Sequence, residues 1–227
     1  MANKIRRSTK SINSKVVQVN FVVDCSGSMG ATAATWKGNK YARYEIVKTA
    51  LNICVAHMQK PDRVQIVEFE SFAKTLVEST SDYTGAMISL SDAYALFPKG
   101  GTNISAGLEE ALKGASNSTK NITILFTDMW DPEGKYISNA FNADCGNGDS
   151  CFKALADLGP VYVIIIADIG QKTMVEEGCK NLSKIVSKDY GIKWNDCYAV
   201  AMDPRSSKSA VDLTQYLTSI GPFYKKE

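Results

Sequence analysis

The chain has 227 residues, 44% of them hydrophobic, so it is long enough to bury one sizeable core. Its formal net charge of +2 gives no reason to expect nucleic acid or an anionic membrane as a partner. No window approaches the roughly 18 consecutive apolar residues of a membrane span, and the N-terminus lacks the apolar centre of a secretory signal. We therefore expect a cytoplasmic protein with no membrane span, although these patterns do not exclude an extracellular location.

The first fifteen residues are basic and poor in apolar side chains. They contain Lys4, Arg6, Arg7, Lys10 and Lys15, and no acidic residue occurs before Asp24. This composition is typical of a solvated, flexible tail, and a docking arm for an acidic partner is the alternative. Residues 16–227 contain no repeat and no long Gly/Ser or Pro linker, so we predict one domain there.

Short apolar runs rich in Val and Ile predict buried strands at residues 15–24, 62–70, 121–128, 160–168 and 197–203. Four of the five runs end on an aspartate. Residues 72–80 alternate in polarity and follow the second run with almost no spacer, which predicts an antiparallel hairpin at a sheet edge.

Amphipathic patterns between these runs predict helices at residues 42–58, after Asn103, at 172–187 and at 208–220. The alternation of strand and helix predicts an α/β domain with a mostly parallel sheet that helices cover on both faces.

Three polar motifs follow or precede these elements: DCSGS at residues 24–28, GGTN at 100–103 and FTD at 126–128. Ligands of an open parallel sheet bind beyond the carboxyl ends of its strands, so these motifs are expected to meet at one edge. Their ligating side chains are Asp24, Ser26, Ser28, Thr102 and Asp128. This set offers only oxygen, which suits Mg²⁺ or Mn²⁺, with Ca²⁺ as a further candidate, and suits zinc poorly.

In this order and at these strand ends, the three motifs resemble the metal-ion-dependent adhesion site of the von Willebrand factor A (vWA) domain family. The resemblance extends from about Val16 onward. It implies a doubly wound, Rossmann-like sheet with strand order 3-2-1-4-5-6. It also implies that the five side chains surround one divalent cation, some directly and some through water, and that a partner protein presents Asp or Glu to an open coordination position.

The residues after the last aspartate depart from the family, which usually has a glycine there. Met129, Trp130 and Asp131 follow instead and are candidate partner contacts. For Trp130, packing against the domain is the alternative.

Two other functions fit part of the pattern. A metal-dependent hydrolase would normally carry a second acid two residues after Asp24, where this chain has Ser26, and no phosphate-binding loop is present. The only histidine, His57, lies near the end of an amphipathic helix, where packing or solvent exposure fits better than general-base work. The other alternative is a structural domain whose metal only ties loops together. We predict a metal-dependent protein-interaction domain without enzymatic activity.

The six cysteines are too sparse for a disulfide scaffold. Cys25, Cys54 and Cys197 lie in apolar or strand-like surroundings and are predicted to be small core residues. Cys145 and Cys151 flank a polar loop, where they either stay reduced or close a small disulfide ring in an oxidising compartment.

Overall fold

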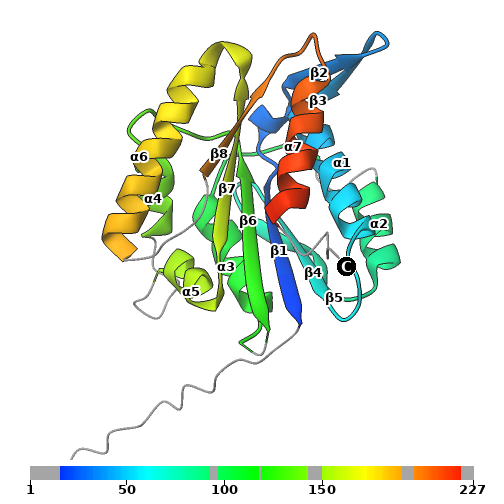
Figure 1. Ribbon diagram of the computed structural model, residues 1–227, viewed down its shortest axis with the longest axis vertical. Coiled ribbons are helices and arrows are strands. Elements are labelled where there is room, and N and C mark those ends of the chain that lie inside the picture. The colour runs from blue at the N-terminus through cyan, green and yellow to red at the C-terminus, as the bar shows by residue number, and fades with distance from the viewer. Residues whose placement is uncertain (1–15, 93–96, 118, 143–149, 191–196, 221–227) are drawn as a thin grey trace, which may run out of the picture.

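The computed structural model describes residues 16–92, 97–117, 119–142, 150–190 and 197–220. A six-stranded sheet in the order β5-β4-β1-β6-β7-β8 forms the centre of the molecule (Figure 1). Its strands are β1 (Val17–Asp24), β4 (Arg63–Phe69), β5 (Ala73–Thr80), β6 (Lys120–Thr127), β7 (Val161–Asp168) and β8 (Cys197–Met202). Counted within the sheet in chain order, this is the strand order 3-2-1-4-5-6, so the expected topology is confirmed.

The sheet is parallel except at one edge. β1 pairs in parallel with β4 and with β6, and β7 pairs in parallel with β6 and with β8. β5 runs antiparallel to β4, as the alternating segment after the second apolar run predicted. The carboxyl ends of β1, β6 and β7 therefore lie at the same edge of the sheet, and Asp24, Asp128 and Asp168 lie at or next to those ends.

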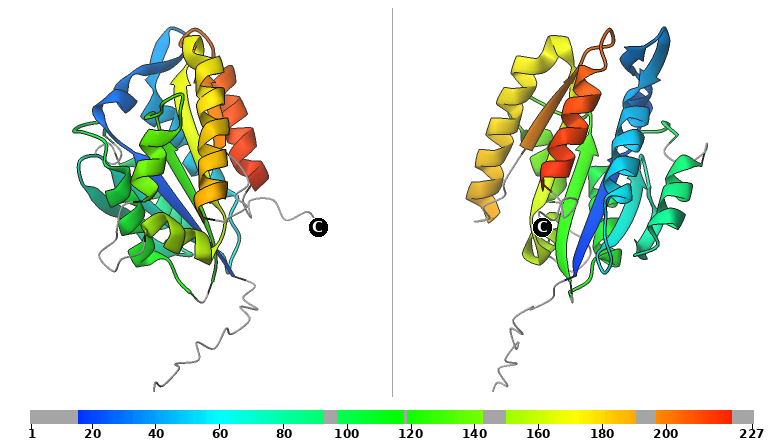
Figure 2. Two further views of the ribbon diagram at one scale, coloured as in Figure 1. Left: turned by 90° about the vertical axis from the view of Figure 1, so that its left-hand side faces the viewer. Right: turned by 45° about the vertical axis from the view of Figure 1, so that its right-hand side comes forward.

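Helices cover both faces of the sheet (Figure 2). One face packs against α1 (Arg43–Ala56), α2 (Tyr83–Ser91) and α7 (Lys208–Ile220). The other packs against α3 (Ile104–Gly114), α4 (Lys135–Phe141), α5 (Cys151–Leu158) and α6 (Lys172–Tyr190). The four predicted helices correspond to α1, α3, α6 and α7. Most of the apolar stripe of each helix packs on the sheet, but Met174 of α6 and Val211 of α7, which were expected in those stripes, are 51% and 52% exposed.

Close packing at one glycine brings α3 down onto the sheet. A Cβ atom at Gly107 would lie 2.6 Å from Cδ1 of Phe69 and 3.0 Å from Cγ1 of Val22. Because no side chain intervenes there, α3 approaches β1 and β4 closely. The loop that precedes α3, which contains Thr102, is thereby held at the carboxyl edge of the sheet.

Several short elements were not predicted from the sequence. A hairpin of β2 (Thr32–Trp36) and β3 (Asn39–Ala42) precedes α1, and two 3-10 turns, η1 (Gly27–Gly30) and η2 (Ile169–Gln171), follow β1 and β7. The hairpin turns at Lys37 and Gly38, which both have positive φ. The short helices α2, α4 and α5 were also not predicted. At the start of α5, the Ser150 hydroxyl accepts a hydrogen bond from the backbone N–H of Lys153 at 3.0 Å.

The prediction that Cys25 and Cys54 are core residues is confirmed, and the two alternatives for Cys145 and Cys151 stay predictions. Cys25 and Cys54 are buried, and burial raises the pKa of the Cys54 thiol to about 12. Cys145, the side chain of Cys197 and the basic tail at residues 1–15 lie outside the described part of the chain. Among the helices that are described, none combines the length and the apolar character needed to cross a membrane.

Candidate functional site

Asp24, the last residue of β1, is fully buried at the strand edge. Its Oδ1 accepts a hydrogen bond from the backbone N–H of Ser26 at 2.8 Å, and its Oδ2 accepts one from the Thr127 hydroxyl at 2.7 Å. Burial raises the pKa of Asp24, the charge of Asp128 adds to the rise, and the hydrogen bonds from Ser26 and Thr127 oppose it. Within the described part of the chain, the hydrogen bonds to this carboxylate come from neutral donors.

Two serines link the end of β1 to the residue after β6. The hydroxyl oxygens of Ser26 and Ser28 lie 3.1 Å apart, and the Ser28 hydroxyl donates to Oδ1 of Asp128 at 2.9 Å. Neighbouring ligand oxygens of an octahedral Mg²⁺ lie about 2.9 Å apart, because each sits at about 2.0 to 2.1 Å from the metal. The oxygen spacing therefore fits the edges of such an octahedron.

Backbone hydrogen bonds join the loop that contains Thr102 to the loop after β1, which places Thr102 next to this cluster. The N–H of Gly27 donates to the carbonyl of Gly100 at 3.3 Å, and the N–H of Lys99 donates to the carbonyl of Cys25 at 2.8 Å. The described hydrogen bonds connect Asp24, Ser26, Ser28 and Asp128 in one chain, and none joins the Thr102 side chain to these four. Four of the five predicted side chains are thus in contact, and the fifth is adjacent to them.

An arginine that sequence reasoning missed contacts the site. Arg43, the first residue of α1, is only 8% exposed. Its Nη1 lies 2.5 Å from Oδ2 of Asp128, and its Nη2 lies 2.8 Å from Oδ1 of Asp168 at the end of β7. Burial acts to lower the pKa of Arg43, but hydrogen bonds and charge attraction to the two aspartates outweigh burial and raise it.

Sequence patterns could have indicated both Arg43 and its second partner, Asp168. Asp168 ends one of the four apolar runs that finish on aspartate, and only two of those runs were assigned to the site. Arg43 lies three and four residues before Ile46 and Val47, so it extends the buried stripe of its helix. A charged residue on a buried apolar stripe is stable only when it is paired, and Asp128 is the buried counter-ion of Arg43.

The candidate partner contacts after Asp128 lie in different surroundings. Met129 and Trp130 are half-buried, and Trp130 packs against the core cluster on the α3 side of the sheet. Asp131 accepts hydrogen bonds from the backbone N–H groups of Glu133 at 2.9 Å, Lys135 at 3.1 Å and Tyr136 at 2.6 Å. Its carboxylate therefore holds the start of α4, and a contact of these three residues with a partner stays a prediction.

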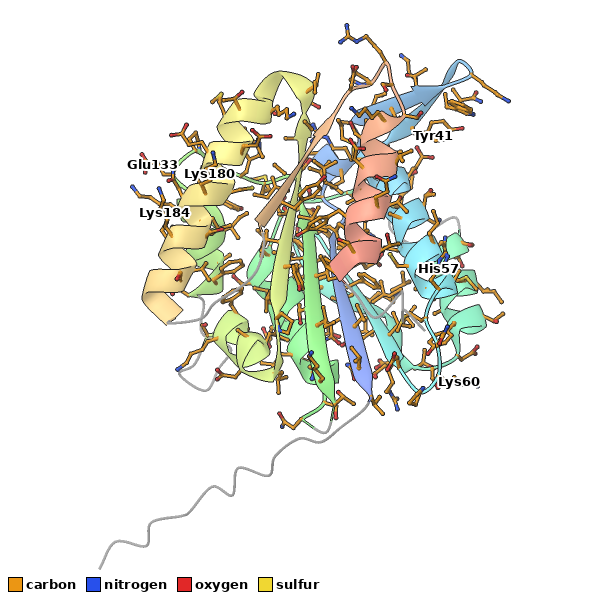
Figure 3. The ribbon with its side chains drawn as sticks, viewed as in Figure 1. Tyr41, His57, Lys60, Glu133, Lys180 and Lys184 are labelled. Carbon is orange, nitrogen blue, oxygen red and sulfur yellow. The ribbon has the colours of Figure 1, made fainter. Side chains whose placement is uncertain are left out.

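Groups that could support other chemistry lie away from the cluster or are inert. Figure 3 shows Tyr41 near the start of α1 and His57 toward its other end, where His57 follows the last turn and is exposed. Burial raises the pKa of Cys25, so its thiol stays protonated. No group of three His, Cys, Asp or Glu side chains that could hold a metal ion occurs among the described residues, so a cation at this edge would depend on hydroxyl ligands.

Exposed aromatic side chains surround the loops of the cluster. Phe72 is 79% exposed in the turn after β4, and Phe97 is 59% exposed just before the Thr102 loop. Both line a hollow of about 160 Å³ that also reaches Cys25 and Lys99. On the other side, the Tyr136 hydroxyl donates to the carbonyl of Thr102 at 3.4 Å. Two large apolar side chains are thus exposed beside the Thr102 loop.

Solved structures with the same fold include three bacterial proteins. The chain matches BatB from Bacteroides thetaiotaomicron at 20% identity, with a TM-score of 0.57 and coverage of 89% of this chain and 98% of that one. It matches a mutant of the PilB minor pilin from Streptococcus sanguinis at 15% identity, with a TM-score of 0.60 and coverage of 94% and 65%. The vWF domain of the type V pili tip protein Mfa5 from Porphyromonas gingivalis matches at 13% identity, with a TM-score of 0.58 and coverage of 93% and 97%. A search of curated protein sequences finds no match.

The sheet order and the oxygen-rich cluster at its carboxyl edge define an open, doubly wound α/β domain of the Rossmann-like class. Residues 19–130, which contain all five predicted ligands, match the sequence family of the von Willebrand factor type A domain. This part of the chain is therefore similar to von Willebrand factor type A domains, and the chain has the Rossmann-like fold of those domains.

Proposed function

We propose that this vWA-like domain binds an acidic side chain of a partner protein through a divalent cation at the carboxyl edge of its sheet. The observation that carries the proposal is the contact chain from Ser26 to Ser28 to Asp128, whose oxygen spacings of 3.1 and 2.9 Å suit adjacent ligands of Mg²⁺. The backbone N–H of Ser26 holds the carboxylate of Asp24 next to this chain. Asp24 would supply the second negative charge of the site, beside that of Asp128. We propose Mg²⁺, with Mn²⁺ or Ca²⁺ as substitutes.

The residue types of the cluster favour recognition of an anion. Serine and threonine hydroxyls are neutral, and Arg43 already neutralises part of the charge of Asp128. A bound dication would therefore keep part of its positive charge and attract a carboxylate from outside. Ser28 and the loop residues around Thr102 reach the surface, so an incoming Asp or Glu has access to this edge.

The surroundings favour a protein as the source of that carboxylate. Exposed aromatic residues are enriched among the side chains that dominate protein interfaces, and Phe72 and Phe97 lie beside the loop that precedes α3. Among proteins of the same fold, one is named as a minor pilin and another as a pilus tip protein. Both names fit a fold that makes contacts between proteins.

We propose that the domain has no catalytic turnover. The position two residues after Asp24 is a serine, the single histidine lies at the far end of α1, and the thiol of Cys25 is buried and protonated. None of these side chains is placed to act as a nucleophile or as a general base at the cluster.

The proposal is tested by measuring Mg²⁺ affinity in sodium acetate and in sodium chloride at equal ionic strength. Calorimetry is expected to show about one site, with tighter Mg²⁺ binding in acetate, because acetate can occupy the position that the partner's carboxylate would take. A structural site with a filled coordination sphere would bind Mg²⁺ equally well in both salts. That result, or no Mg²⁺ binding at all, would contradict the proposal.

A further inference from the structure

Arg43 neutralises a carboxylate of the proposed cation site from inside the protein. The side chain of Asp128 is 1% exposed, and its two oxygens have different neighbours. Oδ1 accepts from the Ser28 hydroxyl at 2.9 Å, whereas Oδ2 lies 2.5 Å from Nη1 of Arg43. A buried carboxylate without a cation would be strongly destabilising, so this ion pair keeps the domain stable when no metal is bound.

Two aspartates hold the guanidinium of Arg43, and a backbone hydrogen bond holds its main chain. The backbone N–H of Arg43 donates to the carbonyl of Ala31 at 3.0 Å, and Nη2 contacts Asp168 at 2.8 Å. Its Nε is buried without a hydrogen-bond partner. A side chain held this way does not swing out when a cation arrives, so its positive charge remains beside the cation.

Charge in the buried part of the site is balanced only when a carboxylate joins the cation. Asp24 and Asp128 contribute two negative charges and Arg43 one positive charge. Asp168 is 55% exposed, so water screens most of its charge and it offsets the charge of Arg43 only in part. A bound dication would leave one positive charge in excess. A carboxylate from a partner would then bring this group of charges to neutrality.

We infer that Arg43 is a built-in counter-cation that weakens the binding of a divalent cation by itself and makes it depend on the partner's carboxylate. This inference rests on the proposed function. Arg43 acts through Asp128 and is a positioning residue. It makes the binding of cation and carboxylate cooperative, because each binds better when the other is present.

The test compares the full-length wild type with Arg43→Gln and Arg43→Lys, using Mg²⁺ alone and Mg²⁺ with acetate as probes. In chelator, Arg43→Gln is expected to melt at a lower temperature than the wild type, and Mg²⁺ should restore most of the loss. Without acetate, Arg43→Gln should bind Mg²⁺ about tenfold more tightly than the wild type, because one repelling charge is gone. Acetate should then strengthen Mg²⁺ binding less than it does in the wild type. Arg43→Lys, which keeps the charge, should stay close to the wild type.

Two further variants make the test decisive. Lys40→Gln removes an exposed positive charge from β3, three residues before Arg43, and should change neither Mg²⁺ affinity nor the acetate effect. Asp168→Asn removes a negative charge that partly offsets the charge of Arg43, so it should weaken Mg²⁺ binding. This variant also provides the test if Arg43→Gln does not fold.

The outcomes separate this inference from the proposed function. If the wild type binds Mg²⁺ but neither Arg43→Gln nor Asp168→Asn shifts the affinity in the stated direction, the role of Arg43 is contradicted and the proposed function stands. If neither the wild type nor Arg43→Gln binds Mg²⁺, the proposed function fails, and the coupling fails with it.

Discussion

Asp24→Ala is expected to abolish the binding of Mg²⁺ at the strand edge. Asp24 is one of two carboxylates in the buried part of the site, and Arg43 already neutralises much of the other. Without Asp24, a dication would face mainly neutral hydroxyls, and its lost hydration would not be compensated. Calorimetric titration with Mg²⁺ should show no saturable heat, where the wild type shows about one site.

Two control variants accompany this measurement. Asp24→Asn keeps the shape of the side chain and can still accept the hydrogen bond from the Ser26 N–H, so it should fold and also fail to bind Mg²⁺. Asp157→Ala removes an exposed carboxylate on α5 and should bind like the wild type. Unchanged Mg²⁺ binding by a folded Asp24 variant would show that the cation does not bind here.

Partner binding is expected to be lost in chelator and strongly weakened by Thr102→Ala. A partner's carboxylate has no cation to bind after chelation, and Thr102 supplies the third hydroxyl proposed for the site. Pull-down from a lysate in Mg²⁺, set against the same experiment in chelator, identifies the partner, and its affinity is then measured with the purified proteins.

Exposed side chains near the site extend this test to the interface. Phe72→Ala should weaken partner binding by about 2 kcal/mol if Phe72 is a hot spot, and should leave Mg²⁺ affinity unchanged because it touches no proposed ligand. Ile88→Ala removes a similarly exposed apolar side chain from α2 and should have no effect. Partner binding that resists both chelator and Thr102→Ala would place recognition elsewhere and leave the metal with a structural role.

The strands of the sheet were predictable because parallel strands buried on both faces produce long apolar runs, whereas their order was implied by the resemblance to the vWA family. β1, β6 and β7 contain such runs, and each ends close to its predicted boundary. The site aspartates were predictable for the same reason, because a polar residue directly after an apolar run lies at the end of the strand. The short hairpin of β2 and β3 lacks such a run, since half of its residues face solvent.

Side chains that serve the site from a distance were harder to predict. Arg43 contacts residues 85 and 125 positions further along the chain, so its counter-ions appear only once α1 is placed against the sheet. Asp131 was proposed as a partner contact because it follows the motif, yet its carboxylate accepts three backbone hydrogen bonds at the start of α4. An acidic residue that accepts backbone hydrogen bonds before a helix and one that contacts a partner look the same in a sequence when the helix is short.

Anomalous diffraction from crystals grown with Mn²⁺ tests the central claim most directly, because it locates the cation itself. We expect one strong peak bonded to the hydroxyl oxygens of Ser26 and Ser28 and close to Asp128, with Arg43 still paired to the other oxygen of that carboxylate. An open position on the cation should hold water or a carboxylate from a neighbouring molecule. A map at saturating Mn²⁺ with no peak at this edge would contradict the account.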